Sequence, residues 1–331
     1  MGVAHQQGVS IQPLGSIWRG KARQVLPLLL LTTTASAAQI YSMTWRPDGG
    51  MLALGGYKEV RLIDAARKPV ATLPGHAEAV RAVAFSRDGK WLAAAGGLPA
   101  RKGEVKIWDV AARTVRITIA GHSDCIYAAA FSPDGATLAT ASYDKLIKLW
   151  DAATGAEIRT LRDHIDSIYA LAFTPDGKRL VSGAADRSVK IWDVATGTRL
   201  YTLSEPADGI NAIALSPDGS RVAAGGFDKT IRIWKLGEKE GKLENSLIAH
   251  EDAILKLAWS ADGRYLASAA ADRTVKIFKA ADLSEVRAIA NLPDWAFGLE
   301  FAPDSKSLAA AFFNGNVEMY EVDHGKALAS R

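Results

Sequence analysis

A four-residue turn sequence that recurs along the chain constrains its fold more than any other feature. The segment "SPDG" at position 132 has counterparts in "RPDG" (46), "SRDG" (86), "TPDG" (174), "SPDG" (216), "SADG" (260) and "APDS" (302). The starts of these seven segments are separated by 40, 46, 42, 42, 44 and 42 residues. A fixed period of this length indicates a repeat architecture and fits a unit of four short strands.

One repeat, residues 121–161, divides at its turns into predicted strands. The strands are "IYAAAF", "TLATAS", "LIKLWD" and "EIRTL", and the turns between them are "SPDG", "YDK" and "ATG". Pro and Gly favour the backbone angles that tight turns require. Since no segment carries a sustained helical period, the sequence predicts an all-β chain of short antiparallel strands.

Recurring dipeptides within the repeats carry a resemblance to a known family. "GH" stands at 75 and 121, "WD" stands at 108, 150 and 192, and an Asp lies in the turn before the third strand. On these residues the chain resembles the WD40 family over about residues 39–331. The resemblance implies a seven-bladed β-propeller with four antiparallel strands in each blade.

Polar and aromatic residues also recur at fixed spacing. In three repeats a His precedes an Asp by 22 residues, a Thr or Ser lies four residues before that Asp, and an aromatic residue lies six after it. The resemblance implies a buried hydrogen-bond chain that ties the strands of a blade together, and such a chain stabilises only when its members are satisfied. The predicted members are His122, Thr140, Asp144 and Trp150; His164, Ser182, Asp186 and Trp192; and His250, Ser268 and Asp272.

Other repeats keep fewer of these residues. Phe278 replaces the Trp of the sixth repeat and cannot donate, and the fifth repeat has Ala224 at the hydroxyl position, although Asp228 and Trp234 remain. A hydroxyl, a His and an Asp together are also the residues of a hydrolase triad. Because a catalytic group is needed once, three sets at fixed spacing inside strands favour the structural interpretation, and no catalytic residue is assigned.

Composition and charge disfavour several classes of partner and cofactor. The net charge is +4, but residues 1–37 hold three basic residues and no acid, which leaves 37 basic against 36 acidic residues in the rest. A nearly neutral body disfavours a nucleic-acid partner. The single Cys125 excludes an internal disulfide and a CxxCH haem attachment, and we expect neither a cofactor nor a metal. No apolar run approaches the ~20 residues of a membrane helix.

Residues 1–38 have two interpretations. Arg19, Lys21 and Arg23, followed by "VLPLLLL" (25–31) and "ASA" (35–37), match a secretory signal, which predicts a periplasmic or otherwise exported propeller of residues 39–331. Alternatively, "LLLLTT" (28–33) is an outermost strand that closes the ring of a cytoplasmic protein. The leucine run would expose at least two leucines on a sheet edge, and "GKALAS" (325–330) can complete the last repeat instead. The sequence therefore favours export, and a ring-closing strand is kept as the alternative interpretation of these residues.

Positions that the repeat does not fix are the candidates for function. Two positions in each repeat are expected on one face around the propeller axis, where the resemblance places the partner site of WD40 proteins. Tyr, Trp and Arg are favoured anchors of interfaces, although the rings also have the alternative of packing against neighbouring blades. The predicted partner-binding residues are Tyr41, Tyr57, Arg81, Arg101, Tyr127, Tyr143, Tyr169, Asn211, Phe227, Trp295, Phe297 and Phe313.

We therefore expect a non-catalytic scaffold that presents an aromatic-rich face to a protein or peptide. The alternative is a propeller enzyme, or an accessory subunit of a redox complex, with its site at the channel mouth. The chain also resembles bacterial WD40 proteins that occur with periplasmic c-type cytochrome domains. Because it has no haem motif, this resemblance implies a cytochrome-containing partner only as a separate chain.

Overall fold

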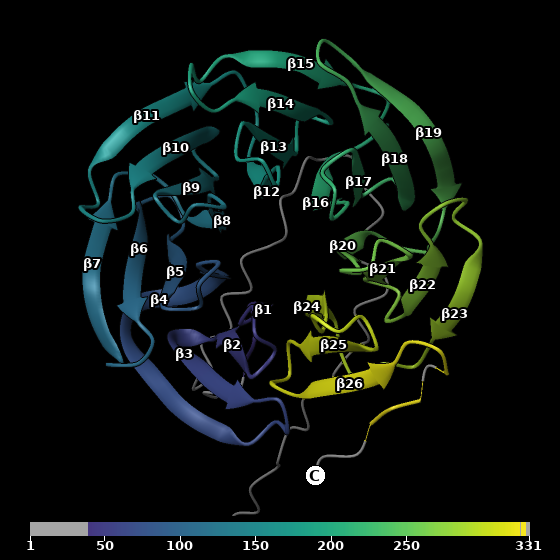
Figure 1. Cartoon of the computed structure of the whole chain (residues 1–331), viewed down its shortest axis with the longest axis horizontal. Coiled ribbons are helices and arrows are strands. Elements are labelled where there is room, and N and C mark those ends of the chain that lie inside the picture. Colours follow the sequence, from purple (N-terminus) through teal and green to yellow (C-terminus); the bar gives the residue numbers. More distant parts are fainter. Residues whose placement is uncertain (1–38, 325, 329–331) are drawn as a thin grey trace, which may run out of the picture. The chain divides into compact units, whose positions relative to one another are not determined.

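The computed structural model describes residues 39–324 and 326–328, in which every regular element is a β-strand. No helix in this part of the chain has the length and hydropathy needed to cross a membrane. The predicted export signal, or closing strand, of residues 1–38 lies outside the described residues. Six antiparallel sheets follow one another in chain order, and Figure 1 shows them arranged around a ring.

The sheets have seven, four, four, four, four and three strands. The first consists of β1 (Ser42–Trp45), β2 (Met51–Gly55), β3 (Tyr57–Asp64), β4 (Pro69–Phe85), β5 (Trp91–Leu98), β6 (Lys102–Asp109) and β7 (Thr114–Ala120). The second and third consist of β8 (Ile126–Phe131), β9 (Thr137–Ser142), β10 (Leu146–Asp151), β11 (Glu157–Arg162), β12 (Ile168–Phe173), β13 (Arg179–Ala184), β14 (Val189–Asp193) and β15 (Arg199–Leu203). The others consist of β16 (Ile210–Leu215), β17 (Arg221–Gly226), β18 (Thr230–Leu236), β19 (Gly241–Ile248), β20 (Ile254–Trp259), β21 (Tyr265–Ala270), β22 (Val275–Lys279), β23 (Glu285–Ile289), β24 (Ala296–Phe301), β25 (Ser307–Phe312) and β26 (Val317–Glu321).

The seven-stranded sheet contains two four-stranded parts that share the long strand β4. Residues 69–79 of β4 pair with β3, whereas Val80–Phe85 pair with β5. The same strand is therefore the outermost strand of one part and the first strand of the next. We number the parts along the chain as units 1 to 7: units 1 and 2 divide β4, units 3 to 6 are the four-stranded sheets, and unit 7 begins with β24.

The recurring turn sequence joins the first two strands of each unit. In unit 3 the amide of Gly135 donates to the carbonyl of Ser132 at 2.8 Å, and the amide of Ser132 donates to the carbonyl of Thr137 at 2.8 Å. Gly135 has φ of 72°, a left-handed conformation that costs glycine little. The amide of Ala136 donates to the Asp134 carboxylate at 3.0 Å. Each residue type of the turn is thus explained by local backbone geometry.

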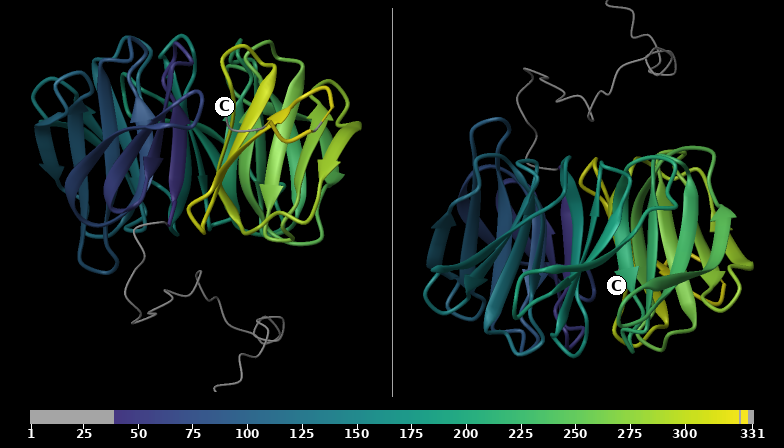
Figure 2. Two further views of the ribbon diagram at one scale, coloured as in Figure 1. Left: turned by 90° about the horizontal axis from the view of Figure 1, so that it is seen from below. Right: turned by 90° about the horizontal axis from the view of Figure 1, so that it is seen from above.

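Apolar side chains hold neighbouring units together. Seven clusters of buried apolar residues occur within the described residues, and each lies between two successive units. Between units 2 and 3, for example, Ile107 and Ile119 pack with Leu138 and Trp150. The first strands also contact one another in order around the ring, and Figure 2 shows the strands running between its two faces. Burial between units on this scale is the main source of stability.

The first and last units are in contact. The backbone amide of Trp45 donates to the Glu300 carboxylate at 2.9 Å, and the Arg67 guanidinium donates to the carbonyl of Leu328 at 2.8 Å. Residues 326–328 run along the outer edge of β26, where Ala327 pairs with Tyr320. The amide of Leu328 donates to the carbonyl of Met319 at 2.7 Å. Part of "GKALAS" therefore lies in the outermost position of unit 7.

Candidate interaction face

Most of the residues predicted to bind a partner lie on one side of the ring. We call this side the start face, because the first strand of each unit begins there and the second strand ends there. The other side carries the PDG-type turns and is called the PDG face. Tyr41, Tyr127, Tyr169 and Phe297 stand at or next to the beginnings of the first strands β1, β8, β12 and β24. Arg81 follows Val80, where the part of β4 that pairs with β5 begins.

Side chains from units 7, 1, 2, 3 and 4 form a continuous series of contacts on the start face. We call this series the aromatic arc. Ring centroids are 5.2 to 6.4 Å apart in its aromatic pairs, which are mostly edge-to-face. The Arg81 guanidinium lies 5.5 Å from the ring centroid of Tyr41 and 5.0 Å from that of Tyr127. In order of contact the arc consists of Trp295, Phe297, Phe313, Tyr41, Arg81 and Tyr127, with Tyr143 and Tyr169 both against Tyr127.

The arc is partly buried and partly open to solvent. Trp295 is 36% exposed, and the other members are half-buried. Burial raises the pKa of Tyr41 and Tyr127, although the Arg81 guanidinium opposes the shift in both. Edge-to-face pairs and cation–π contacts each contribute about 1 kcal/mol and restrict the rings. Each ring therefore packs against its neighbour, as one interpretation expects, and also keeps a part that is accessible to solvent, as the other expects.

Four predicted residues lie outside the arc. Tyr57 contacts the ammonium of Lys58 at 5.1 Å, and Arg101 is exposed at the tip of the β5–β6 hairpin. The Asn211 amide donates to the carbonyl of Ile254 at 2.9 Å, which joins units 5 and 6. Phe227 lies over Gly209. The segment "GGLPARKGE" (96–104) is longer than its counterparts in the other repeats, which predicts a long turn. The turn is shorter, because β5 and β6 continue through this segment and leave only residues 99–101 between them.

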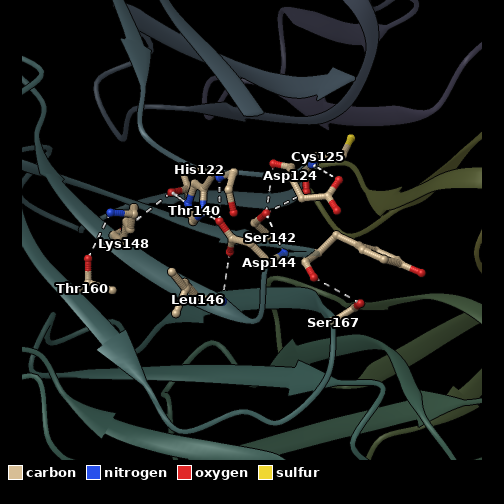
Figure 3. A network of polar contacts seen from close by, with 12 residues as sticks. His122, Asp124, Cys125, Thr140, Ser142, Asp144, Leu146, Lys148, Thr160 and Ser167 are labelled. Atoms are coloured by element: carbon tan, nitrogen blue, oxygen red, sulfur yellow. Dashed lines mark hydrogen bonds and ion pairs between the residues drawn. The ribbon is translucent and has the colours of Figure 1, made fainter. Parts of the chain in front are cut away.

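The recurring His, Asp and hydroxyl residues meet in hydrogen-bond chains, and Figure 3 shows His122, Thr140 and Asp144 of the chain in unit 3. In unit 3, His122 Nδ1 lies 2.9 Å from Asp144 Oδ2, and His122 Nε2 lies 2.8 Å from Thr140 Oγ1. Trp150 Nε1 donates to the same Thr140 oxygen at 2.8 Å. The assignment that satisfies every group has Trp donating to the hydroxyl, the hydroxyl to His, and His to the carboxylate.

Unit 4 repeats this arrangement, and unit 6 repeats it without the Trp, which Phe278 replaces. His164 lies 2.8 Å from Asp186 and 2.7 Å from Ser182, which accepts from Trp192 at 2.9 Å. Although burial raises the pKa of Asp186, its hydrogen bonds and the charge of His164 lower it to about 2. In unit 6, the ring nitrogens of His250 lie 3.0 Å from Asp272 and 2.7 Å from Ser268.

These chains lack the access that a hydrolase triad needs. The side chains of His122, His164 and His250 are 0% exposed, and so are Thr140 and Ser182. A nucleophilic hydroxyl must reach the substrate, whereas these hydroxyls lie inside the sheets. No group of three or more possible metal ligands occurs in residues 39–324 and 326–328.

The incomplete chains have partners that the sequence did not indicate. In unit 5, Asp228 forms an ion pair with Arg232 at 2.6 Å, and Trp234 Nε1 donates to Glu205 at 3.2 Å. The repeated pattern has a His 22 residues before the Asp, so it gives no indication of a partner Arg four residues after the Asp. Alternative partners thus replace the missing His and hydroxyl in this unit.

Unit 2 contains a fourth, broken chain. His76 Nδ1 lies 3.3 Å from Glu104, which takes the place of the Asp. Ala94 pairs with Lys106 just as Thr140 pairs with Lys148, so Ala94 occupies the hydroxyl position. Without that hydroxyl, His76 Nε2 and Trp108 Nε1 are both buried with no hydrogen-bond partner. Burial, followed by the charge of Lys106, lowers the pKa of His76 to about 4.

Two ionisable residues in the first strands also escaped the sequence analysis. One residue before the end of each first strand, five units have Ala and unit 1 has Thr44, whereas unit 7 has Glu300. Burial raises the pKa of Glu300 to about 7, against the hydrogen bond from the Trp45 amide. Lys256 likewise stands where four units have Ala. Aligning the repeats and asking where a charge replaces Ala would have found both.

The PDG face has a cavity of about 670 Å³ between units 1 and 2, lined by Met51, Leu62, Val70, Trp91 and Ala111 among others. Its position has a structural reason. In units 3 to 6 a side chain on the outermost strand donates to a turn carbonyl of the following unit: Arg159 to Ala195, Tyr201 to Gly237, Asn245 to Ala281 and Arg287 to Asp323. Unit 1 has Ala71 at the paired position, which cannot bridge to Ala111.

Repeated four-stranded antiparallel sheets arranged around a ring define a propeller-like class of all-β repeat protein. Sequence comparison gives the family. A model described as "WD domain, G-beta repeat" matches residues 67–109, 113–151, 155–193, 197–235 and 241–279, which together make up more than half of the chain. The chain belongs to the WD40 family. The matches begin with outermost strands, so they are offset from the sheets by one strand. These matches cover only the outermost strand of unit 1 and end before unit 7.

The chain is also similar to the Target of rapamycin complex subunit wat1 of Schizosaccharomyces pombe. The two are 38% identical over 82 residues. The matched stretch is 24% of this chain and 25% of the relative, so the likeness covers about a quarter of each protein.

Proposed function

We propose that this protein is a non-catalytic scaffold whose aromatic arc binds another protein or a peptide. WD40 repeats are associated with protein interaction, and the yeast relative is, by its name, a subunit of a complex. The alternative, an enzyme or redox accessory subunit with its site near the axis, needs converging titratable groups. The start face instead carries aromatic rings around Arg81, which favours binding.

The observation that carries this proposal is the continuity of the arc. Rings from units 7, 1, 3 and 4 contact one another in pairs 5.2 to 6.4 Å apart, and Arg81 of unit 2 joins Tyr41 to Tyr127. These side chains nevertheless stay partly exposed. Their positions are held by neighbouring rings, so a partner that binds there orders few side chains. Rigid aromatic anchors of this kind dominate the energy of protein interfaces.

A capture experiment tests the proposal. The full chain is immobilised and exposed to extract of its own cells, beside a variant with Tyr127→Ala and Phe297→Ala. The matched control replaces two aromatic residues on the PDG face, Trp91→Ala and Tyr265→Ala. We expect the first variant to lose at least tenfold of the captured protein and the control to retain it. Equal capture by the folded wild type and the first variant would contradict the proposal.

We also propose that the units form a closed, seven-bladed β-propeller. The seven apolar clusters support this, because one of them joins unit 7 to unit 1. The hydrogen bonds from Trp45 to Glu300 and from Arg67 to Leu328 span the same junction at the inner and outer edges. The seven-stranded sheet then counts as two blades that share β4.

Export of the mature chain remains a proposal that rests on the sequence of residues 1–38. Its test is the N-terminal sequence and mass of the protein purified from fractionated native cells. A start at Ala38 or Gln39 in the periplasmic fraction supports export, whereas an intact N-terminus in the cytosol contradicts it. A haem stain of the chains captured on the start face tests the proposed cytochrome-containing partner.

A further inference from the structure

Three charged side chains stand within the first strands of the seven units, with Val80–Phe85 taken as the first strand of unit 2. They are Arg81, Lys256 and Glu300. Arg81 and Lys256 lie four and three residues before the end of their strands, toward the start face. Glu300 lies one residue before the end of β24, toward the PDG face. Arg81 is itself a member of the aromatic arc, and Lys256 lies in the half of β20 that is nearer the start face.

Arg81 is held in place without a negatively charged partner. The rings of Tyr41 and Tyr127 contact its guanidinium from two neighbouring units. Its Nε is buried and makes no hydrogen bond, and its other hydrogen-bonding partner is the uncharged Cys125 thiol. No ion pair joins it to a carboxylate among the described residues. A guanidinium has five N–H donors, so one that is fixed and has no carboxylate partner can donate to the carboxylate of a ligand.

Lys256 is unpaired as well. It is the one long side chain among Ser42, Ala82, Ala128, Ala170, Ala212 and Gly298, which occupy its position in the other units. No ion pair or hydrogen bond joins its ammonium to another described residue, and burial lowers its pKa. An ammonium half-buried without a partner destabilises the fold, and a hydrophobic side chain of similar size would avoid that cost.

The acidic groups nearby do not neutralise these cations. Asp124 accepts hydrogen bonds from the amides of Ala100 at 2.7 Å and Cys125 at 2.6 Å. Glu78 raises the pKa of Tyr41 and Cys125 by its charge but forms no ion pair with Arg81. Glu300 accepts from the Trp45 amide on the far side of the strands. Arg81 on the start face and Lys256 in β20 are therefore two cations that have no carboxylate partner among the described residues.

We infer that the aromatic arc binds a partner segment that carries a carboxylate, and that Arg81 and Lys256 receive this group. The inference rests on the proposed function, since it names the chemistry of the ligand at the same face. The aromatic rings supply apolar contact on either side of the carboxylate. Bidentate hydrogen bonds to a guanidinium fix the orientation of that group, which gives the site selectivity for Asp, Glu or a C-terminal carboxylate over neutral residues.

The probe is a library of random twelve-residue peptides displayed on phage and selected on the folded full chain. Enriched peptides are then made with the acidic residue intact or changed to its amide, and with a free or an amidated C-terminus. We expect Asp or Glu at one position, and a loss of about tenfold in affinity when it is amidated, as one charge-assisted hydrogen-bonded pair contributes about 1.4 kcal/mol. A loss on amidating the C-terminus alone assigns the terminal carboxylate instead.

Variants identify the receiving residues. Arg81→Gln and Lys256→Met are each expected to reduce the preference for the acid over the amide several-fold, and Arg81→Lys to restore part of it. Lys256→Met is also expected to raise the stability of the free protein, because it removes an unpaired ammonium. A residue with only a structural role would change stability without changing the preference. Arg187→Gln, an exposed arginine in the β13–β14 turn, is the control and should change neither.

The outcomes separate this inference from the proposed function. Two results would overturn the carboxylate site without affecting the proposed binding face. In the first, selected peptides need Tyr127 and Phe297 but show no preference for an acidic residue. In the second, the preference for an acidic residue persists in folded Arg81→Gln. Peptides that do not depend on Tyr127 and Phe297, or the absence of any enriched peptide, overturn both.

Discussion

At the scale of single residues, one hydroxyl decides whether a buried chain is satisfied. Thr140 joins Trp150 to His122 in unit 3, whereas Ala94 leaves Trp108 and His76 unpaired at the matching place in unit 2. A buried polar group without a partner costs more than a typical hydrogen bond contributes. The two units therefore form a natural comparison of the same site with and without its central oxygen.

We predict opposite effects of exchanging this hydroxyl. Ala94→Ser should raise the free energy of unfolding by about 1 kcal/mol, since it supplies partners for His76 and Trp108. Thr140→Val, which keeps the shape, should lower it by about 2 kcal/mol by leaving His122 and Trp150 unpaired. Chemical denaturation monitored by circular dichroism measures both. A decrease for Ala94→Ser would show that unit 2 has no room for the chain.

Glu300 should make stability depend on pH. Its pKa is about 7 in the folded protein, above the usual 4.5, so its contribution is complete below pH 4.5 and is lost as the pH rises through 7. Glu300→Gln keeps an acceptor for the Trp45 amide and removes the titration. From pH 4 to pH 8 the variant should gain up to about 3 kcal/mol over the wild type, at about 1.4 kcal/mol per pKa unit. A constant difference across this range would contradict the assignment.

Side-chain partners could be predicted from the sequence only where the residues repeat at a fixed spacing. The spacing of His, hydroxyl, Asp and Trp is visible because it repeats, and the structure brings His122, His164 and His250 to these partners. Residues that break the period, such as Arg232, Glu205 and Lys256, carry no such signal. Their partners are set by the packing of side chains from different units, which a periodic pattern does not encode.

At the scale of elements, the strands follow the turns that bound them, and the repeat predicted most of them. The sequence did not predict that β4 runs without a break from the edge of unit 1 into the start of unit 2. Nor did it predict that β5 and β6 extend into the segment expected as a long turn. In both cases backbone pairing continued through residues that look like a loop by composition.

The contact between the first and last units depends on a glycine in β24. A Cβ on Gly298 would lie 2.5 Å from the Cβ of Met43 and 3.0 Å from that of Ala311. Gly298→Ala should therefore lower the free energy of unfolding by about 2 kcal/mol through overpacking. Gly56→Ala is the matched control, because the nearest atoms to its Cβ would lie at 3.4 Å. Equal thermal unfolding of the two variants would show that this contact is loose.

At the scale of the whole molecule, residues near the C-terminus join the last unit to the first. Residues 326–328 pair with β26, and Leu328 accepts from Arg67 of unit 1. Deleting 324–331 should lower the free energy of unfolding by about 3 kcal/mol, since it removes about three hydrogen bonds and an apolar contact. Deleting 1–38 should leave it unchanged. The reverse result would make the leucine-rich segment the closing strand.

The role proposed for the aromatic arc is to bind a partner. Hydroxyl-radical footprinting of the complex with a captured protein or selected peptide tests it directly, because aromatic side chains report their own accessibility. We predict that oxidation of Tyr127, Tyr169, Trp295 and Phe297 falls several-fold on binding. Oxidation of two aromatic residues on the PDG face, Trp91 and Tyr265, should be unchanged. Protection confined to the PDG face or to the outermost strands would contradict it.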